Sequence, residues 1–155
     1  MNESSRTALR ALLGAHFEET ATGAVLAPGH EREIIQVLRL LAERGERLGP
    51  GLSLSRRRFM EVGPIDEKSA VVRAGAGVKL SALEQAVSTA GYTLGPLSPG
   101  ARARELGDFL EGPYAGRRAI PGGRLEPLCL ALEAVTAEGL RYASRPTPRS
   151  AAGPD

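Results

Sequence analysis

The stretch that decides the fold runs from Ile65 to Val78 and reads IDEKSAVVRAGAGV. Asp66-Glu67-Lys68 has the composition of a turn, and it lies between two apolar runs, Phe59 to Val62 and Ser69 to Ala74. With Gly63-Pro64 as further turn chemistry, the stretch predicts two short strands that form a β-hairpin. We expect the hairpin to end in the glycine turn that precedes Val78.

Helical periodicity flanks this hairpin on both sides. Lys79 to Ala90 carries an apolar face of Leu80, Leu83 and Val87 and is followed by Gly91 as a stop signal. Upstream, Glu31 to Arg44 is followed by Gly45 and has apolar residues at the i, i+3, i+4 and i+7 positions Ile34, Val37, Leu38 and Leu41. The pattern predicts two amphipathic helices.

The remaining elements follow from shorter patterns. Ser5 to Glu19 has helical spacing of its leucines and Phe17, which predicts an N-terminal amphipathic helix. Leu52 to Ser55 alternates as Leu-Ser-Leu-Ser, the two-residue period of a half-buried strand. Gly95 to Gly123 is rich in glycine and proline without an apolar period, so we expect mainly loops and short turns there.

Order returns near the C-terminus. Leu125 to Thr136 predicts a strand, and Leu140 to Ala143 a short partner strand across an Ala137-Glu138-Gly139 turn. Cys129 lies within the first of these strands, so we interpret it as a small buried core residue. Residues 145–155 are rich in Pro, Ser and Arg and predict a flexible tail.

Composition excludes several classes of protein. The 155 residues are 42% hydrophobic and 25% charged, which fits one globular core. Apolar runs stay short of the ~18 residues that a spanning helix needs, and no secretory signal is visible, so we expect a cytoplasmic protein without a membrane segment. One cysteine with two histidines, His16 and His30, predicts no disulfide and no metal site, and we interpret both histidines as surface residues.

The charge pattern gives little support for a nucleic-acid partner. The formal net charge is +2, tryptophan is absent, and only six residues are aromatic. We interpret the run Arg56 to Arg58 as a solvated, charge-balancing stretch, the alternative being a segment that faces phosphate.

Four stretches together resemble the FAD-binding domain of the vanillyl-alcohol oxidase and p-cresol methylhydroxylase family, most of all its branch with the glycolate oxidase FAD subunit and alkyldihydroxyacetonephosphate synthase. Pro28 to Gly45 is similar to the family's opening helix, and Ile65 to Val78 to its "ID…V.AGAGV" hairpin. Leu83 to Gly95 resembles "LE…L…GYTLG", and Gly123 to Gly139 resembles "G.IEDLVLGLEVVTPDG". The resemblance covers residues 23 to 155.

The resemblance implies an α+β fold, a reduced FAD-binding subdomain of the p-cresol methylhydroxylase type with the start of a second subdomain and without the cap domain. It divides the chain into an N-terminal helical extension over 1–22, a truncated FAD-binding-type domain over 23–144 and the tail over 145–155. FAD is the implied cofactor, with binding expected to be weak or lost.

The sequence departs from the family at the phosphate loop. Family members carry "GGGTS", whose backbone N–H groups close on the pyrophosphate. The nearest candidate is Gly49-Pro50-Gly51-Leu52-Ser53, in which proline removes one donor. Two alignments stay open: this loop is a residual cradle, or Leu52 to Arg56 matches the family's "LDLSR" strand and the loop has been deleted. The residues by themselves favour an ordinary turn before a strand over a cradle, because a short glycine pair is a weak motif.

The candidate cofactor-binding residues follow from these matches. They are Gly49, Gly51, Ser53, Gly107, Gly116, Gly122 and Gly123. The family's "TLGG" flavin loop corresponds to Glu105-Leu106-Gly107-Asp108, which puts a carboxylate beside the predicted cofactor. The resemblance provides no catalytic residue.

Three hypotheses remain open at this level. The first is an FAD-binding-type module related to flavin-dependent oxidoreductases that is not catalytic alone and acts as a homo-oligomer or with a partner protein. The second is a degenerate flavin fold that no longer binds FAD and serves as an interaction or regulatory protein. The third is a truncated remnant without a function of its own, against which the near-intact apolar pattern of both helices argues weakly. We also expect an exposed apolar face where a further layer would pack.

Overall fold

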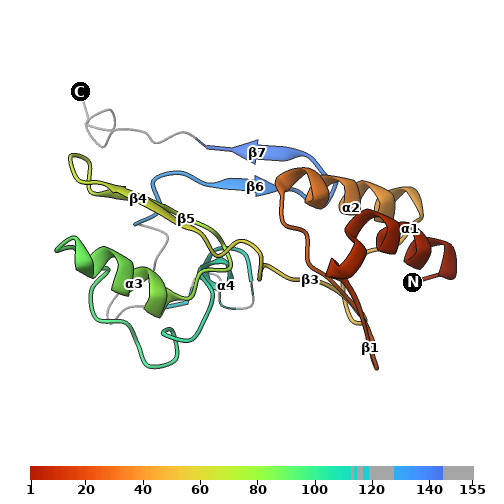
Figure 1. The fold of residues 1–155 in the computed structure, drawn as a ribbon, viewed down its shortest axis with the longest axis horizontal. Coiled ribbons are helices and arrows are strands. Elements are labelled where there is room, and N and C mark those ends of the chain that lie inside the picture. Colours follow the sequence, from red (N-terminus) through yellow and green to blue (C-terminus); the bar gives the residue numbers. More distant parts are fainter. Residues whose placement is uncertain (113, 115–116, 119–127, 145–155) are drawn as a thin grey trace. The chain divides into compact units, whose positions relative to one another are not determined.

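The computed structural model describes residues 1–112, 114, 117–118 and 128–144. The chain forms two compact units: Met1–Ser55 with Cys129–Asp155, and Arg56–Leu128. Both mix helices with small sheets, as expected for an α+β fold. The elements are drawn in Figure 1, and each unit is described by itself.

The first unit begins with helix α1, Glu3–Leu13. The Asn2 side chain caps it by accepting a hydrogen bond of 2.8 Å from the Ser5 N–H. The helix predicted over Ser5 to Glu19 is too long, because α1 ends at Leu13 and Gly14 has φ +55°. A short 3-10 turn follows over Gly14–His16, and Phe17–Thr20 forms strand β1. Glycine adopts this positive φ readily, which lets the chain leave the helix there.

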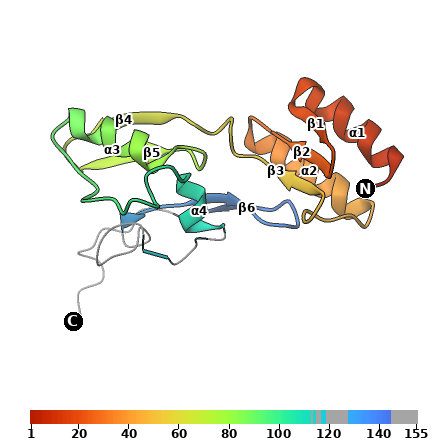
Figure 2. The ribbon, with the colours of Figure 1, turned by 90° about the horizontal axis from the view of Figure 1, so that it is seen from below.

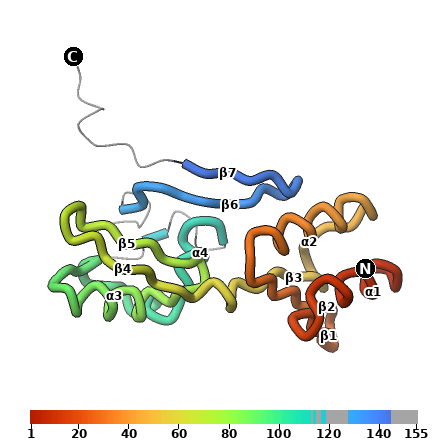
Figure 3. Tube along the Cα trace, turned by 45° about the horizontal axis from the view of Figure 1, so that its top comes forward, coloured from red at the N-terminus to blue at the C-terminus, as the bar shows by residue number. Residues whose placement is uncertain are grey.

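Strand β2, Gly23–Leu26, lies at the centre of a three-stranded sheet. It pairs antiparallel with β1 and parallel with β3, Leu52–Leu54. Helix α2, Glu31–Glu43, connects the two parallel strands, as Figure 3 shows along the chain trace. The predicted helix and the Leu-Ser-Leu strand are both confirmed, and Gly45 ends the helix with φ +66°.

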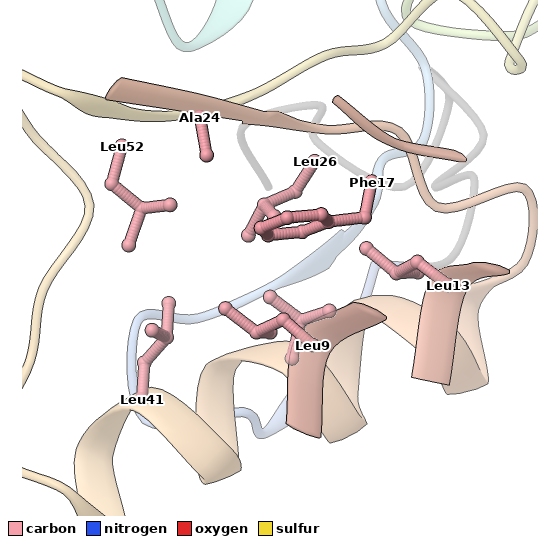
Figure 4. Close-up of a cluster of buried hydrophobic side chains, with 8 residues drawn as sticks. Leu9, Leu13, Phe17, Ala24, Leu26, Leu41 and Leu52 are labelled. Atoms are coloured by element: carbon pink, nitrogen blue, oxygen red, sulfur yellow. The ribbon is translucent and has the colours of Figure 1, made fainter. Parts of the chain in front are cut away.

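The core of this unit lies between the sheet and the two helices (Figure 4). Leu9 and Leu26 are completely buried and Leu41 is 2% exposed. Burial of side chains of this size stabilises a fold by about 1.5–3 kcal/mol each. The cluster consists of Leu9, Leu13, Phe17, Ala24, Leu26, Val37, Leu41 and Leu52. Residues of the N-terminal extension therefore share one core with the sheet and α2.

A second hairpin belongs to the same unit: β6, Glu133–Val135, pairs antiparallel with β7, Arg141–Ala143. The predicted partner strand and turn are confirmed, whereas residues 128–132 of the predicted longer strand are not in a strand. Residues 119–127 and the predicted tail over 145–155 lie outside the described residues. Cys129 is exposed, so its prediction as a core residue is wrong: the segment before β6 has no packed layer over it in the described structure.

The second unit is built on the predicted hairpin, β4 Val62–Asp66 with β5 Val71–Ala74 (Figure 2). The strand prediction over Phe59 to Val62 is displaced, because Gly63-Pro64 lies inside β4 rather than in a turn. The register shifts between Val62 and Ile65, an irregularity that accommodates a proline without a ladder donor.

Two helices complete this unit. Helix α3, Leu80–Thr89, confirms the prediction and packs Leu83 and Val87 with Val78 against the hairpin. Helix α4, Leu106–Leu110, is a short helix within the stretch expected to be mainly loop. It buries Phe109 beside Leu80, Leu97 and Ala101, so a second small cluster holds the loop in place. Among the described residues, no helix is long and apolar enough to cross a bilayer.

Candidate functional site

The predicted phosphate loop is a tight turn in the first unit. Gly49 and Leu52 exchange two backbone hydrogen bonds of 2.9 Å, and the Gly51 carbonyl accepts a hydrogen bond of 2.9 Å from the Ala24 N–H. Gly51 has φ +88°, and a Cβ on Gly23 would clash with the Gly51 carbonyl. Gly23 and Gly51 therefore allow this turn to pack closely against β2.

Few donors remain in this turn for a phosphate. The Gly49 N–H bonds within the chain, and Pro50 has no N–H. Ser53 is exposed and lies within β3 opposite Val25. Of the other candidates, Gly107 belongs to the second unit, while Gly116, Gly122 and Gly123 lie outside the described residues.

In the second unit the glycine turn after β5 lies against the chain's own backbone. The N–H of Gly75 donates to the Glu61 carbonyl and that of Gly77 to the Phe59 carbonyl, both at 2.9 Å. A Cβ on Gly75 would clash with the Phe59 carbonyl, and one on Gly77 with the Arg56 carbonyl. The backbone of Phe59 and Arg56 therefore occupies the space beside these two glycines.

Arg56 forms a polar cluster with three carboxylates of the second unit. Its Nε lies 3.1 Å from Glu105 Oε2, its Nη2 2.5 Å from Asp108 Oδ1 and its Nη1 3.1 Å from Glu111 Oε1. The side chains of Arg56 and Asp108 are only 20% and 18% exposed. Burial opposes the charge of Arg56, but the hydrogen bond to Glu105 and the charges of Glu111 and Asp108 outweigh it and raise its pKa.

The expectation of a solvated, charge-balancing run over Arg56 to Arg58 is therefore correct for charge balance at Arg56 and wrong for its solvation, because its side chain is only 20% exposed. Three carboxylates around α4 offer one guanidinium more favourable contacts than water does. These acidic residues are spaced every three positions, at 105, 108 and 111. Like charges at this spacing repel each other on a helix, so the sequence indicates that a cation lies near them. The sequence did not indicate which of three adjacent arginines would supply it.

Gly107 lies beneath this guanidinium. A Cβ there would come within 2.7 Å of Arg56 Nε, and the Gly107 N–H donates to the Ala76 carbonyl at 2.7 Å. The carboxylate of Asp108, expected to face a cofactor, faces Arg56 instead. In the described structure Gly107 thus provides room for an arginine of the same unit.

A shallow cleft lies beside α3 and is lined by Ser81, Glu84, Thr93 and Arg102, among others. Glu84 accepts hydrogen bonds from Thr93 Oγ1 at 2.6 Å and from the Leu94 N–H at 2.8 Å. The Thr93 hydrogen bond is the main cause that lowers the pKa of Glu84. The carboxylate thereby ties the segment after α3 back to the helix. The described residues contain no cluster of three or more His, Cys, Asp or Glu that could hold a metal ion.

The FAD binding domain family matches residues 22–142, which is most of the chain, and the protein belongs to this family. A curated relative, the uncharacterized FAD-linked oxidoreductase YgcU of Escherichia coli K12, is 33% identical over 91 residues. The same match is found with YgcU of Escherichia coli O157:H7. The aligned part is 59% of this chain and 19% of the relative.

Solved structures support the same fold. Alkyldihydroxyacetonephosphate synthase superposes with a TM-score of 0.74 at 15% identity, over 97% of this chain and 36% of the synthase. p-Cresol methylhydroxylase with substrate bound gives a TM-score of 0.61 at 16% identity, over 90% of this chain and 34% of that protein. The resemblance drawn from the sequence is confirmed, and the chain spans about a third of the length of these structures.

The family match supports FAD as the cofactor. The backbone donors at the predicted residues do not fit its pyrophosphate, because the N–H groups of Gly49 and Gly107 bond within the chain and Pro50 has none. In the second unit, Gly75, Gly77 and Gly107 lie against atoms of Phe59 and Arg56. Phosphate contacts by the described part of the chain therefore need donors other than the N–H groups of Gly49 and Gly107.

Proposed function

We propose that this chain is the FAD-binding-type module of a flavin-dependent oxidoreductase, that it is not catalytic alone, and that it acts as an oligomer or with a partner polypeptide. The family match supports the cofactor, and the similarity to YgcU, an FAD-linked oxidoreductase, supports the class of reaction. The observation that carries the need for a partner is the uncovered face of the β6–β7 hairpin.

This face follows from the register of the hairpin. Ala134 lies opposite Tyr142, and the Ser144 N–H donates to the Leu132 carbonyl. Since side chains alternate along a strand, Leu132, Leu140 and Tyr142 lie on one face. They are 39%, 58% and 53% exposed. The opposite face carries Arg141, whose Nε lies 3.1 Å from Glu31 Oε1 at the start of α2.

Three exposed apolar side chains thus share one face of the hairpin. Two strands alone are marginally stable in water and gain stability when a further strand or layer covers their apolar side. The described residues of this unit leave Leu132, Leu140 and Tyr142 uncovered. A second polypeptide, or a second copy of this chain, would provide that layer.

A second candidate function is a flavin fold that no longer binds FAD and serves in interaction or regulation. The filled space at Gly77 and Gly107 and the engaged N–H of Gly49 favour it. Both candidates share the uncovered hairpin face. They differ in one measurable property, the affinity for FAD.

The deciding experiment is a titration of the purified chain with FAD, followed by absorbance and gel filtration with light scattering. The module hypothesis predicts flavin bands that co-elute with a species larger than a monomer. Protein that elutes without flavin at saturating FAD would favour the second candidate. A strict monomer at high concentration would contradict the proposed assembly.

Two leucine variants locate the assembly surface. Leu132 and Leu48 are both 39% exposed, but only Leu132 lies on the apolar face of the hairpin. We expect Leu132→Ser to weaken self-association or partner binding and Leu48→Ser to leave it unchanged. Equal effects of the two substitutions would show that the hairpin face is not the contact surface.

A further inference from the structure

Two arginines of the second unit converge on one aromatic ring. The guanidinium carbon of Arg104 lies 4.4 Å from the centroid of the Tyr114 ring, and that of Arg117 lies 5.4 Å from it. The two guanidinium carbons are therefore no farther apart than the sum of these two distances. The arrangement brings two positive charges together on the surface of this unit.

Backbone contacts fix the positions of all three residues. The Tyr114 N–H donates to the Asp108 carbonyl at 3.1 Å, and the Arg117 N–H donates to the Tyr114 carbonyl at 2.9 Å. The Arg104 N–H donates to the Ala101 carbonyl, and the Arg104 carbonyl accepts from the Leu80 N–H. Tyr114 also packs against Phe109, with ring centroids 5.9 Å apart. Hydrogen bonds thus hold the backbone of all three residues, and the two exposed guanidinium groups contact the Tyr114 ring.

Neither arginine has a carboxylate partner among the residues that the structure describes. The acidic side chains nearest to them in sequence, Glu105, Asp108 and Glu111, all bind Arg56. A cation on an aromatic ring gains only about 0.5–1 kcal/mol at an exposed site, so the ring does not replace a counter-ion. Two like charges held close together favour the binding of an anion between or beside them.

We propose that Arg104 and Arg117 form a binding site for a phosphate-bearing anion. A guanidinium presents several N–H donors in one plane and binds phosphate oxygens through paired, charge-assisted hydrogen bonds. A diphosphate has oxygens at both ends and can accept from both arginines. Two sources of this chemistry are the diphosphate of FAD and a free phosphate or diphosphate ion.

The test uses the full chain and inorganic pyrophosphate. Because the protein has no tryptophan, binding can be followed through tyrosine fluorescence and checked by calorimetry. We expect Arg104→Gln and Arg117→Gln each to weaken pyrophosphate binding by about tenfold or more. Arg47→Gln removes the same charge from an exposed residue of the other unit and is expected to leave binding unchanged.

Arg117→Lys keeps the charge and removes the planar fork, so we expect intermediate affinity. Far-UV circular dichroism of each variant checks that the fold is retained. Pyrophosphate binding that is absent from the unsubstituted protein, or weakened equally by Arg47→Gln, would overturn the site.

Titrations with FAD and riboflavin separate the two sources. Weaker FAD binding in Arg104→Gln and Arg117→Gln, with riboflavin binding unchanged, would assign the site to the FAD diphosphate. Pyrophosphate binding without FAD binding would support the anion site with a free ion as its ligand, and would contradict the proposed FAD function. The two proposals can therefore fail independently.

Discussion

The Arg56 guanidinium lies over Gly107, so close that a Cβ on Gly107 would come within 2.7 Å of Arg56 Nε and 2.9 Å of its Cδ. Contacts with Glu105, Asp108 and Glu111 hold the guanidinium at that place. The arginine cannot move aside without weakening these ion pairs. This relationship makes Gly107 a packing requirement of the second unit.

Gly107→Ala should therefore destabilise the protein by about 1–3 kcal/mol, because the added methyl group displaces Arg56. Thermal and urea unfolding measure the change. Gly100→Ala is the matched control, since nothing lies within 4 Å of a Cβ at that position. Similar unfolding curves for the two variants would refute the role of Gly107.

Arg56→Gln should destabilise the protein at pH 7, because it leaves three carboxylates close together without their cation. Asp108 is only 18% exposed and is affected most. Added salt screens the repulsion between the carboxylates, so the difference from the unsubstituted protein should shrink at high ionic strength. Urea unfolding at low and high salt measures this, and a difference that does not depend on salt would argue against electrostatic repulsion as the cause.

Glu46 connects the segment after α2 to the start of α1. The Glu46 Oε1 accepts hydrogen bonds from the Asn2 N–H at 2.8 Å and from Ser5 Oγ at 3.0 Å. The hydrogen bond from Asn2 is the main cause that lowers the pKa of Glu46 below the ordinary 4.5. A carboxyl with a lowered folded pKa stabilises the fold above its unfolded pKa. That stabilisation is lost as the pH falls through the folded value.

Glu46→Gln should accordingly reduce stability at pH 7 and have a smaller effect below pH ~4. Glu43→Gln, an exposed change at the end of α2, should have little effect at either pH. Unfolding midpoints across this range test the prediction. A stability deficit of Glu46→Gln that grew on acidification would contradict the lowered pKa of Glu46 in the folded protein.

Gly23→Ala should destabilise the first unit strongly, because its Cβ would clash with the Gly51 carbonyl that bonds to β2. Gly49→Ala should be tolerated, since nothing lies within 4 Å of a Cβ there. Circular dichroism with thermal unfolding distinguishes the two. Equal loss of stability would show that Gly49 has a packing role beyond the turn.

Much of the secondary structure could be predicted from local patterns. The two amphipathic helices, α2 and α3, appear close to their predicted positions, because their apolar periods and glycine stops are local signals. The β4–β5 hairpin is also present, with its first strand displaced from the prediction. Strand β2, Gly23–Leu26, was not predicted. It has only four residues, and its pairing with β3 joins segments that are distant in sequence.

The candidate site was harder to predict. The glycines at 49, 51 and 107 resemble ligand-binding positions in a pattern, but a pattern does not indicate which atoms face them. Their neighbours come from distant segments: Ala24 donates to Gly51, and Arg56 covers Gly107. A glycine that binds a ligand and a glycine that accommodates its own chain look identical in a sequence.

By itself the sequence determined the family, helices α2 and α3 and the glycine stops after them, because these depend on residue type and spacing over a few positions. The tertiary structure alone decided that Arg56 rather than Arg57 or Arg58 binds the three carboxylates around α4, and that Cys129 is exposed. It also decided that Leu132, Leu140 and Tyr142 share an uncovered face. Such outcomes depend on which distant residues meet, and burial and ion pairing exist only after the chain has brought them together.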